Sequence, residues 1–305
     1  MRSEDRFIPS YIPLHESGEL VHRAERLFEI LKNCSLCPRR CGVNRMAGES
    51  GVCRVGESLM VSSAFPHFGE EAPLVGYSGS GTIFLTHCNL RCVFCQNYDI
   101  SHEGRGEEIS GDELAGYMIA LMKRGCHNIN FVTPTHFVPQ IVASLPRAIE
   151  CGLNIPIVYN TGGYDSPDVI RLLDGIVDIY MPDYKFSDNE AAKRYMNAPD
   201  YPVVVREVLK EMHRQVGTLT LDEVGIARRG LLIRHLVMPS GLQGTDAAAR
   251  FIADELSKDS YINIMEQYHP AYRASEYPEI ARRIGIEEYH DAIRAARMAG
   301  MTRGF

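Results

Sequence analysis

The sequence lacks any long hydrophobic run, and this absence excludes a membrane-spanning helix. No apolar stretch of the 305 residues approaches the roughly 18 residues that such a helix requires. The opening residues, MRSEDRFIPS, also lack the basic region followed by an apolar one that marks a secretion signal. We therefore expect a cytoplasmic protein without a membrane partner.

Clustered positive charge is missing as well. The formal net charge is -7, with 32 Lys and Arg against 39 Asp and Glu. Binding to nucleic-acid phosphates normally requires a clustered basic face, so we expect no nucleic-acid partner. Internal repeats and low-complexity tracts are also absent, and the composition is that of a soluble globular protein.

Cysteine is scarce, but it is unevenly placed. Nine cysteines in 305 residues are too few for a disulfide scaffold. Seven of them fall in two tight clusters, which in an intracellular protein indicates metal binding before disulfides. The other two, Cys126 and Cys151, lie close to predicted helices, and we interpret them as small buried hydrophobic residues.

The second cluster, at C-x3-C-x2-C spacing, consists of Cys88, Cys92 and Cys95. Three soft thiolates can hold three irons of a cubane cluster and leave the fourth iron open. A metal with one missing protein ligand is typical of a site that binds a substrate or cofactor. The alternatives are a zinc knuckle or incidental core cysteines. Neither explains the apolar strand before the motif or the pattern of strands and helices after it.

The first cluster, at C-x2-C-x3-C-x11-C spacing, consists of Cys34, Cys37, Cys41 and Cys53. Neighbouring proline and glycine residues supply the tight turns that let backbone amides wrap a metal site. Four thiolates complete the shell of either a zinc ion or a second 4Fe-4S cluster, and the spacing does not decide between them. Because no position is left open, we expect a structural or electron-relay role. Free thiols are the remaining alternative.

From residue 82 onward, apolar strands alternate with amphipathic helices. The predicted strands cover 82–85, 129–132, 155–159, 177–181, 231–238 and 261–265, and the main helices cover 110–125, 137–150, 166–175, 189–196, 203–215, 246–256 and 286–299. We expect Pro146 to break the second helix and Thr245 to cap the sixth. This order indicates parallel β/α units. Six units are too few to close, so the expected α/β fold is an open, partial (β/α)6 barrel.

Two regions are expected along the chain. Residues 1–60 form an extended arm over 1–18, a helix over 19–32 and the four-cysteine segment. Residues 61–305 form the partial barrel with C-terminal helices. Between them, residues 62–85 begin as a turn-rich linker in which His67 packs on Phe65 or Phe68.

Polar residues follow each predicted strand, at the edge where such barrels place their catalytic groups. In strand order these are the cysteine loop, Thr133 to Thr135, Asn160 to Gly163, Asp183 with Lys185, Pro239 to Gly241, and Gln267 to His269. We therefore expect them to converge on one rim of the barrel. An open barrel of this kind has a lateral mouth through which a large substrate could enter.

The cysteine spacing, with Phe94 just before the last cysteine, resembles the radical S-adenosylmethionine (radical SAM) superfamily. The run CNLRCVFCQNYDIS, the Asp183 and Lys185 pair and His269 resemble the pyruvate formate-lyase activating enzymes, particularly homologues with an N-terminal CxxCPRxC segment. The likeness spans about residues 34 to 300. It implies a 4Fe-4S cluster whose open iron binds SAM. It also implies reductive cleavage to methionine and a 5'-deoxyadenosyl radical, followed by hydrogen abstraction, as in an anaerobic oxidoreductase.

The resemblance also implies roles for single residues. Cys88, Cys92 and Cys95 ligate the cluster, and the backbone near Phe94 lies along the adenine. Asp183, Lys185 and His269 contact the methionine or ribose portion of SAM. This is chemically sensible, since a carboxylate requires a cation and an ammonium requires acceptors. An ordinary ion pair at the rim is the alternative for Asp183 and Lys185.

Two departures from the activating enzymes leave the substrate open. Thr133-Pro134-Thr135 replaces their Gly-Gly-Glu, so threonine hydroxyls and free carbonyls would receive the amino group of SAM, and Asn160 replaces an aspartate. The candidate substrates are a glycyl-radical enzyme, a small metabolite or another protein, with flavodoxin or ferredoxin as reductant. A non-catalytic iron-sulfur electron carrier is a further alternative, which the open three-cysteine site disfavours.

Overall fold

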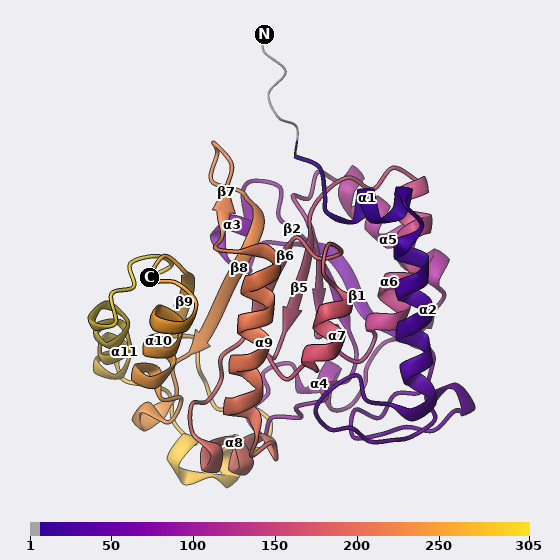
Figure 1. The fold of residues 1–305 in the computed structure, drawn as a ribbon. Coiled ribbons are helices and arrows are strands. Elements are labelled where there is room, and N and C mark those ends of the chain that lie inside the picture. Colours follow the sequence, from indigo (N-terminus) through magenta and orange to yellow (C-terminus); the bar gives the residue numbers. More distant parts are fainter. Residues whose placement is uncertain (1–6) are drawn as a thin grey trace.

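The computed structural model describes residues 7–305, and its core is one mixed β-sheet (Figure 1). Six strands of this sheet run parallel: β2 (Ser80–Leu85), β4 (Ile129–Val132), β5 (Ile157–Thr161), β6 (Ile179–Pro182), β8 (Ala227–Leu236) and β9 (Tyr261–Met265). The sheet does not close on itself, because β9 pairs with β8 alone while β2 is flanked by an antiparallel strand. The predicted open barrel of six β/α units is confirmed.

Three antiparallel strands complete the sheet among the described residues. β1 (Leu59–His67) pairs with the edge of β2, and β3 (Glu107–Ile109) pairs with β1. The prediction of a linker at this point was therefore wrong over 62–67. The strand is hard to see because only its first residues alternate between buried and half-buried. β7 (Thr220–Leu221) is a short strand that precedes β8 in the chain and pairs with it in the antiparallel direction.

Helices cover the convex face of the sheet. α2 (Glu19–Ile30), α5 and α6 lie on one flank, and α10 and α11 lie on the other (Figure 1). Their bounds are α5 (Gly111–Lys123), α6 (Val138–Glu150), α7 (Pro167–Leu172), α8 (Asn189–Met196), α9 (Tyr201–Val216), α10 (Thr245–Glu255) and α11 (Ile286–Met298). No helix among residues 7–305 combines the length and the apolar character needed to cross a membrane.

The concave face of the sheet has its own small core. Strand residues alternate between faces, so that Ile157 and Tyr159 pack on the helix side while Val158 packs with Ile179 in a second apolar cluster. Leu74 of the short helix α3 (Ala72–Val75) joins this cluster. α3 therefore covers one end of the concave face, and the carboxyl ends of the strands remain for a site.

The N-terminal residues begin with a helix rather than the expected extended arm. α1 (Tyr11–Glu16) precedes the predicted helix α2 (Glu19–Ile30), and residues 1–6 of the expected arm lie outside the described part of the chain. The backbone N–H and hydroxyl of Ser10 both donate to Asp178, each at 2.8 Å. This contact ties the N-terminus to the start of β6.

Some predicted helix ends were wrong. Pro146 lies inside α6 without breaking it, because α6 is held between α2 and α5 and buries Leu145 and Ala148. Thr245 is the first residue of α10 rather than its cap, and its hydroxyl accepts from the side chain of Gln243. At the start of α5, the Ser110 hydroxyl accepts from the N–H of Glu113 and the Glu113 carboxylate accepts from the N–H of Ser110, which forms a capping box.

Two predictions for single side chains had mixed outcomes. Cys126 is buried, as expected, but Cys151 is exposed just after α6. His67 makes an edge contact with Phe65, as expected, and a second one with Phe84.

The buried Asp178 makes stability dependent on pH. Burial raises the pKa of its carboxyl to about 6, against hydrogen bonds from Ser10 and Ile157 that lower it. Because the folded pKa lies above the unfolded one, this stabilising contribution is complete below about pH 4 and is lost as the pH rises through about 6. Urea unfolding should show wild type losing up to about 2 to 3 kcal/mol relative to Asp178→Asn over that range. Asp254→Asn, which replaces an exposed carboxyl and keeps Asp178, should follow wild type, and equal slopes for both variants would contradict the assignment.

Candidate active site

The cysteine loop begins where β2 ends and is held by contacts on both sides. The N–H of Val93 donates to the carbonyl of Tyr195 at 3.0 Å, and the N–H of Arg273 donates to the carbonyl of Val93 at 2.9 Å. A His102 ring nitrogen lies 3.1 Å from the carbonyl of Cys92. Positive φ angles at His87 and Arg91 fold the loop tightly enough to turn its sulfurs inward.

The three thiols of this loop share one environment. Burial raises the pKa of the Cys92 thiol well above its ordinary value, the nearby Cys88 and Cys95 raise it further, and Lys185 opposes them. Backbone and side-chain groups also reach the sulfurs, since the N–H of Leu90 lies 3.4 Å from Cys88 Sγ and Ser101 Oγ lies 3.0 Å from Cys95 Sγ. Buried thiols become thiolates when a metal supplies positive charge.

The donor set suits a cluster better than a single ion. No three His, Cys, Asp or Glu side chains within residues 7–305 converge on one ion position. Thiolates that each bind a different iron of a cubane stand farther apart than thiolates that share one ion. Three soft sulfurs at this spacing therefore fit a 4Fe-4S cluster.

A cavity of about 200 Å³ lies beside the thiols. Its lining includes Cys92, Cys95, Asp183, Lys185 and Arg234. Lys185 Nζ lies 2.6 Å from an Asp183 oxygen, and both side chains keep some exposure, at 18% and 13%. The cavity thus combines a soft-metal site with a cation and a carboxylate that a zwitterionic ligand could use.

Arg234 organises the charges behind this cavity. Its guanidinium donates to Asp183 at 2.8 Å and to the Asn160 side-chain oxygen at 2.8 Å. It also lies 3.7 Å from Glu70 and 3.9 Å from Glu71. Burial alone would raise the pKa of Asp183, but Arg234 and Lys185 outweigh it and lower that pKa. Asp183 is therefore held ionised.

The remaining concave face is polar and acidic. Burial raises the pKa of Glu70 to about 7, with Arg234 opposing and Glu71 adding to the increase. One oxygen of Glu71 and both amide atoms of Asn130 are buried without a hydrogen-bond partner in the described structure. Polar groups of this kind extend the site beneath Arg234.

Phe94 and His269, which were also expected near SAM, take different positions relative to the cavity. Phe94 lines the cavity and packs edge-on against Phe186 and Tyr268, with ring centroids 5.9 and 6.3 Å apart. His269 lies at the mouth, where its ring contacts the Gln96 side chain at 3.2 Å. Gln96 itself lines the cavity.

The two threonines after β4 do not share one role. Thr133 has a positive φ of 61° and donates its N–H to the Asn160 carbonyl at 2.8 Å. Thr135 is buried, and its hydroxyl donates to Asp165 at 2.7 Å. Neither threonine is among the residues that line the cavity beside the cysteines.

The four N-terminal cysteines line one cavity, but among residues 7–305 no three of the cysteines lie close enough together to share a single ion. Cys34, Cys37, Cys41 and Cys53 line one small cavity together with the buried Arg45. Burial raises the pKa of Cys37 to about 12. Burial raises the pKa of Cys53 as well.

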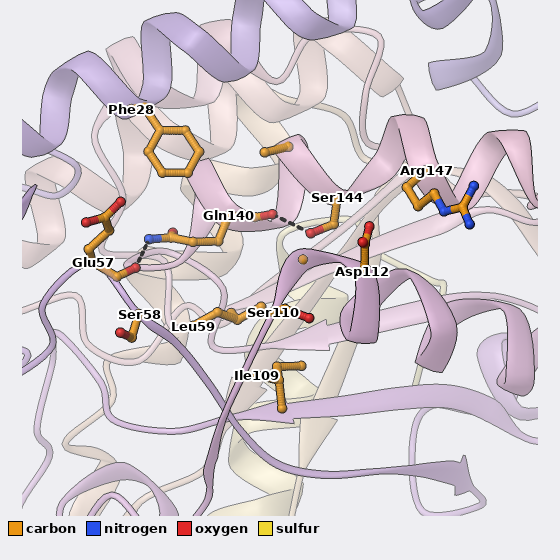
Figure 2. Close-up of a pocket in the computed structure, with 12 residues that line it drawn as sticks. Phe28, Glu57, Ser58, Leu59, Ile109, Ser110, Asp112, Gln140, Ser144 and Arg147 are labelled. Atoms are coloured by element: carbon orange, nitrogen blue, oxygen red, sulfur yellow. Dashed lines mark hydrogen bonds between the residues drawn. The ribbon is translucent and has the colours of Figure 1, made fainter.

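A larger cavity of about 500 Å³ lies elsewhere, between the start of α5, α6 and the beginning of β1 (Figure 2). Figure 2 shows Gln140 donating to the Glu57 carbonyl inside it, with Phe28 and Arg147 at its margins. Its lining contains no cysteine or histidine. It therefore offers none of the metal chemistry that the cysteine loop provides.

Sequence reasoning missed several residues of the site. Arg234 was counted only as part of an apolar strand, although one arginine in LLIRHLVM is a signal of a functional or paired charge. Glu70 and Glu71 lie in the stretch that was predicted as a turn-rich linker, and no role was assigned to them. Gln96, Leu236 and Met265, which line the cavity, carry no chemical signal in the sequence.

Comparisons with known proteins agree with this geometry. The family model described as "Radical SAM superfamily" matches residues 82–224. Uncharacterized protein MJ0674 of Methanocaldococcus jannaschii is 38% identical over 279 residues, which cover 88% of this chain and 75% of that protein. Uncharacterized protein MJ0808 of the same organism is 24% identical, over 87% and 80%.

A solved structure also aligns. The crystal structure of methylornithine synthase (PylB) aligns over 73% of this chain and 63% of its own, with 11% identity and a TM-score of 0.46. The family match begins within β2 and includes the cysteine loop, Asp183 and Lys185. With the relatives spanning most of both chains, the protein belongs to the radical SAM superfamily.

Proposed function

We propose that the protein cleaves SAM reductively at a 4Fe-4S cluster held by Cys88, Cys92 and Cys95, and then abstracts a hydrogen atom from its substrate. One observation carries this proposal: Cys92 and Cys95 line the same cavity as the Asp183 and Lys185 pair. Superfamily membership implies the cluster and SAM themselves. The shared environment of the three sulfurs supports the ligand assignment.

Each polar residue of the cavity has a defined task in this proposal. Lys185 binds the carboxylate of SAM, and Asp183 accepts hydrogen bonds from its ammonium or ribose hydroxyls. Arg234 keeps Asp183 ionised and in place through their 2.8 Å contact. Phe94, packed on Phe186 and Tyr268, holds the backbone along which the adenine lies. His269 and Gln96 border the opening of the cavity.

The cofactor supplies the electron transfer that these side chains cannot. When bound and reduced, it donates one electron to SAM, which releases methionine and a 5'-deoxyadenosyl radical that takes a hydrogen atom. The protein contributes ligation, orientation of the sulfonium ligand and exclusion of water from the buried loop. Thr133 and Asn160 support the cavity from the neighbouring strands, since Asn160 accepts from Arg234.

The substrate is the least constrained part of the proposal. A glycyl-radical enzyme is the first candidate, supported by the open sheet, which leaves room for a protein loop. A small metabolite or another protein is the second, because Thr135 is bound to Asp165 and is not free to act as the activating enzymes' glutamate does. A reductant such as flavodoxin or ferredoxin, a cytoplasmic location and zinc or a second cluster at the N-terminal cysteines complete the proposal.

Replacing Cys92 with Ala should abolish formation of 5'-deoxyadenosine. The variant loses one of three cluster ligands, so the anaerobically reconstituted protein, given SAM and dithionite, should show at least about a 100-fold drop in product. Chromatography of the reaction mixture measures this. Cys151→Ala is the matched control, because Cys151 is exposed and belongs to neither cysteine cluster. SAM cleavage by Cys92→Ala at the wild-type rate would overturn the ligand assignment.

Lys185→Met should weaken SAM binding while leaving the cluster in place. Loss of a charged hydrogen-bond partner costs about 1.5 to 3 kcal/mol, which corresponds to about a 10- to 100-fold higher Kd for SAM. Equilibrium binding to the loaded protein measures the change. Lys193→Met, on the exposed side of α8, serves as the control. Equal affinities for both variants, with equal iron content, would exclude a direct role for Lys185.

A further inference from the structure

We propose that Cys34, Cys37, Cys41 and Cys53 hold a second 4Fe-4S cluster, which passes electrons through Asn89 to the three-cysteine site. This inference rests on the function proposed above, because it gives that reaction its route for electrons. It assigns a redox task to the N-terminal segment, where a zinc ion would supply only stability.

The four-cysteine cavity is shaped closely around its sulfurs. Gly51 has no alternative there, since a Cβ at this position would lie 2.6 Å from Cys41 Sγ. The N–H of Val52 lies 3.4 Å from the same sulfur. Burial raises the pKa values of Cys37 and Cys53, and backbone groups at Arg39 and Val55 oppose this increase. Hydrogen bonds to cysteine sulfurs are among the features that set the potential of an iron-sulfur cluster.

A buried cation indicates that the centre at this site is anionic. Arg45 lines the cavity, is fully buried, and forms no ion pair with a carboxylate among the described residues. Two of its nitrogens donate to the carbonyls of Gly56 and His136, each at 2.8 Å, while Nη2 has no partner. A buried charge of this kind requires compensation. Four thiolates around a cluster supply negative charge next to it.

The number of cations favours a centre that gains negative charge. Arg39 and Arg40 line the same cavity as Arg45, so three arginines contribute to the surroundings of the four sulfurs. A zinc centre keeps a constant charge, whereas an iron-sulfur cluster becomes more negative on reduction. Nearby cations stabilise the reduced form. The arrangement therefore suits a centre that accepts electrons.

One buried side chain lies at the junction of the two sites. Asn89 is 3% exposed, and its oxygen lies 4.0 Å from Sγ of Cys88, its neighbour in the sequence. Burial raises the pKa of Cys37, and the Asn89 side chain is among the groups that oppose this increase. The Asn89 amide nitrogen donates to the Tyr164 carbonyl at 2.7 Å, which fixes its orientation. Asn89 is therefore close to a cysteine of each site.

Two arginines strengthen this junction. Arg39 donates to the carbonyls of Asn89 and Leu90, at 3.1 and 3.5 Å, and so holds the N-terminal segment against the cysteine loop. Arg91 is close enough to both Cys88 and Cys53 for each to act on its pKa. One of its guanidinium nitrogens is buried without a partner. A positive charge between two anionic clusters lowers their mutual repulsion.

The electron balance is simple. In each turnover one electron leaves a low-potential iron-sulfur or flavin carrier, enters the four-cysteine site, moves to the three-cysteine site and breaks the S–C5' bond of SAM. Methionine and the 5'-deoxyadenosyl radical are the products of that cleavage. No proton has to move between the two sites.

Metal content and magnetic resonance test the second cluster without SAM. Anaerobically purified wild type should contain about eight irons and about eight sulfides per chain, and a Cys37→Ser/Cys41→Ser variant about four of each. After dithionite reduction, the electron paramagnetic resonance spectrum of wild type should show two spin-coupled clusters. The double variant and a Cys88→Ala/Cys92→Ala/Cys95→Ala variant should each show one uncoupled signal. Zinc in wild type, or two uncoupled signals, would overturn the proposal.

Rapid-freeze reduction tests the route. The Asn89→Leu variant keeps all seven cysteines of the two sites. With reduced flavodoxin as the electron donor, its three-cysteine cluster should become reduced at least about tenfold more slowly than that of wild type. Reduction by small dithionite should change little, because it reaches either site directly. Cys126→Ala/Cys151→Ala is the control, since neither cysteine belongs to a cluster. Equal flavodoxin rates in Asn89→Leu and wild type would refute the relay.

The two proposals fail in different ways. If both clusters are present and coupled but no 5'-deoxyadenosine forms, the relay geometry stands and the proposed reaction is wrong. If dithionite-driven SAM cleavage is intact in a protein that holds zinc at the N-terminal cysteines, the reaction stands and the relay is wrong.

Discussion

The parallel register of β2, β4, β5, β6 and β8 is the constraint on which the site depends. Parallel strands end at a common edge, so a loop that follows one strand meets the loops that follow its neighbours. This alone brings the cysteine loop after β2 within reach of Asp183 and Lys185 after β6. Arg234 lies on β8, which is separated from β5 by β6. It links the ends of β6 and β5 through its hydrogen bonds to Asp183 and Asn160.

Charge compensation explains much of the remaining architecture. Three thiols, two glutamates and an aspartate are set against Lys185 and Arg234 on the concave side. On the N-terminal side, Arg45 is buried next to cysteines, and both Arg45 and the half-buried Arg91 have a guanidinium nitrogen that is buried without a partner among residues 7–305. Isolated buried charges are costly, and metal-thiolate centres are the groups in this protein that would balance them.

The sequence predicted the repeating parts of the fold well. Ile129–Val132, Asn189–Met196 and Tyr261–Met265 lie where their patterns placed them, because apolar periodicity and capping residues act locally. β1 was missed, since its pairing with the edge of β2 is a non-local event that Ser62, Ser63 and Pro66 conceal. Pro146 was misjudged for a related reason: packing between α2 and α5 overrides a local preference.

The candidate site divides in the same way. The cysteine motif and the Asp183 and Lys185 pair could be found because their chemistry is visible in residue type and spacing. Arg234, Gln96 and Asn89 could not, because their importance lies in what they touch after folding. Thr135 shows the converse, since a residue in the expected position is engaged by Asp165 from the next loop.

The anchoring of Arg39 has a consequence for biogenesis. Besides the carbonyls of the cysteine loop, its guanidinium donates to those of Met196 and Asn197, the latter 158 residues farther along the chain. The first four cysteines therefore leave the ribosome long before the residues that hold this segment in place have been synthesised. Until the chain has been made through β6 and α8, these thiols are open to unwanted metal binding and to oxidation. The N-terminal centre proposed above would thus mature late, after completion of the body that supports it.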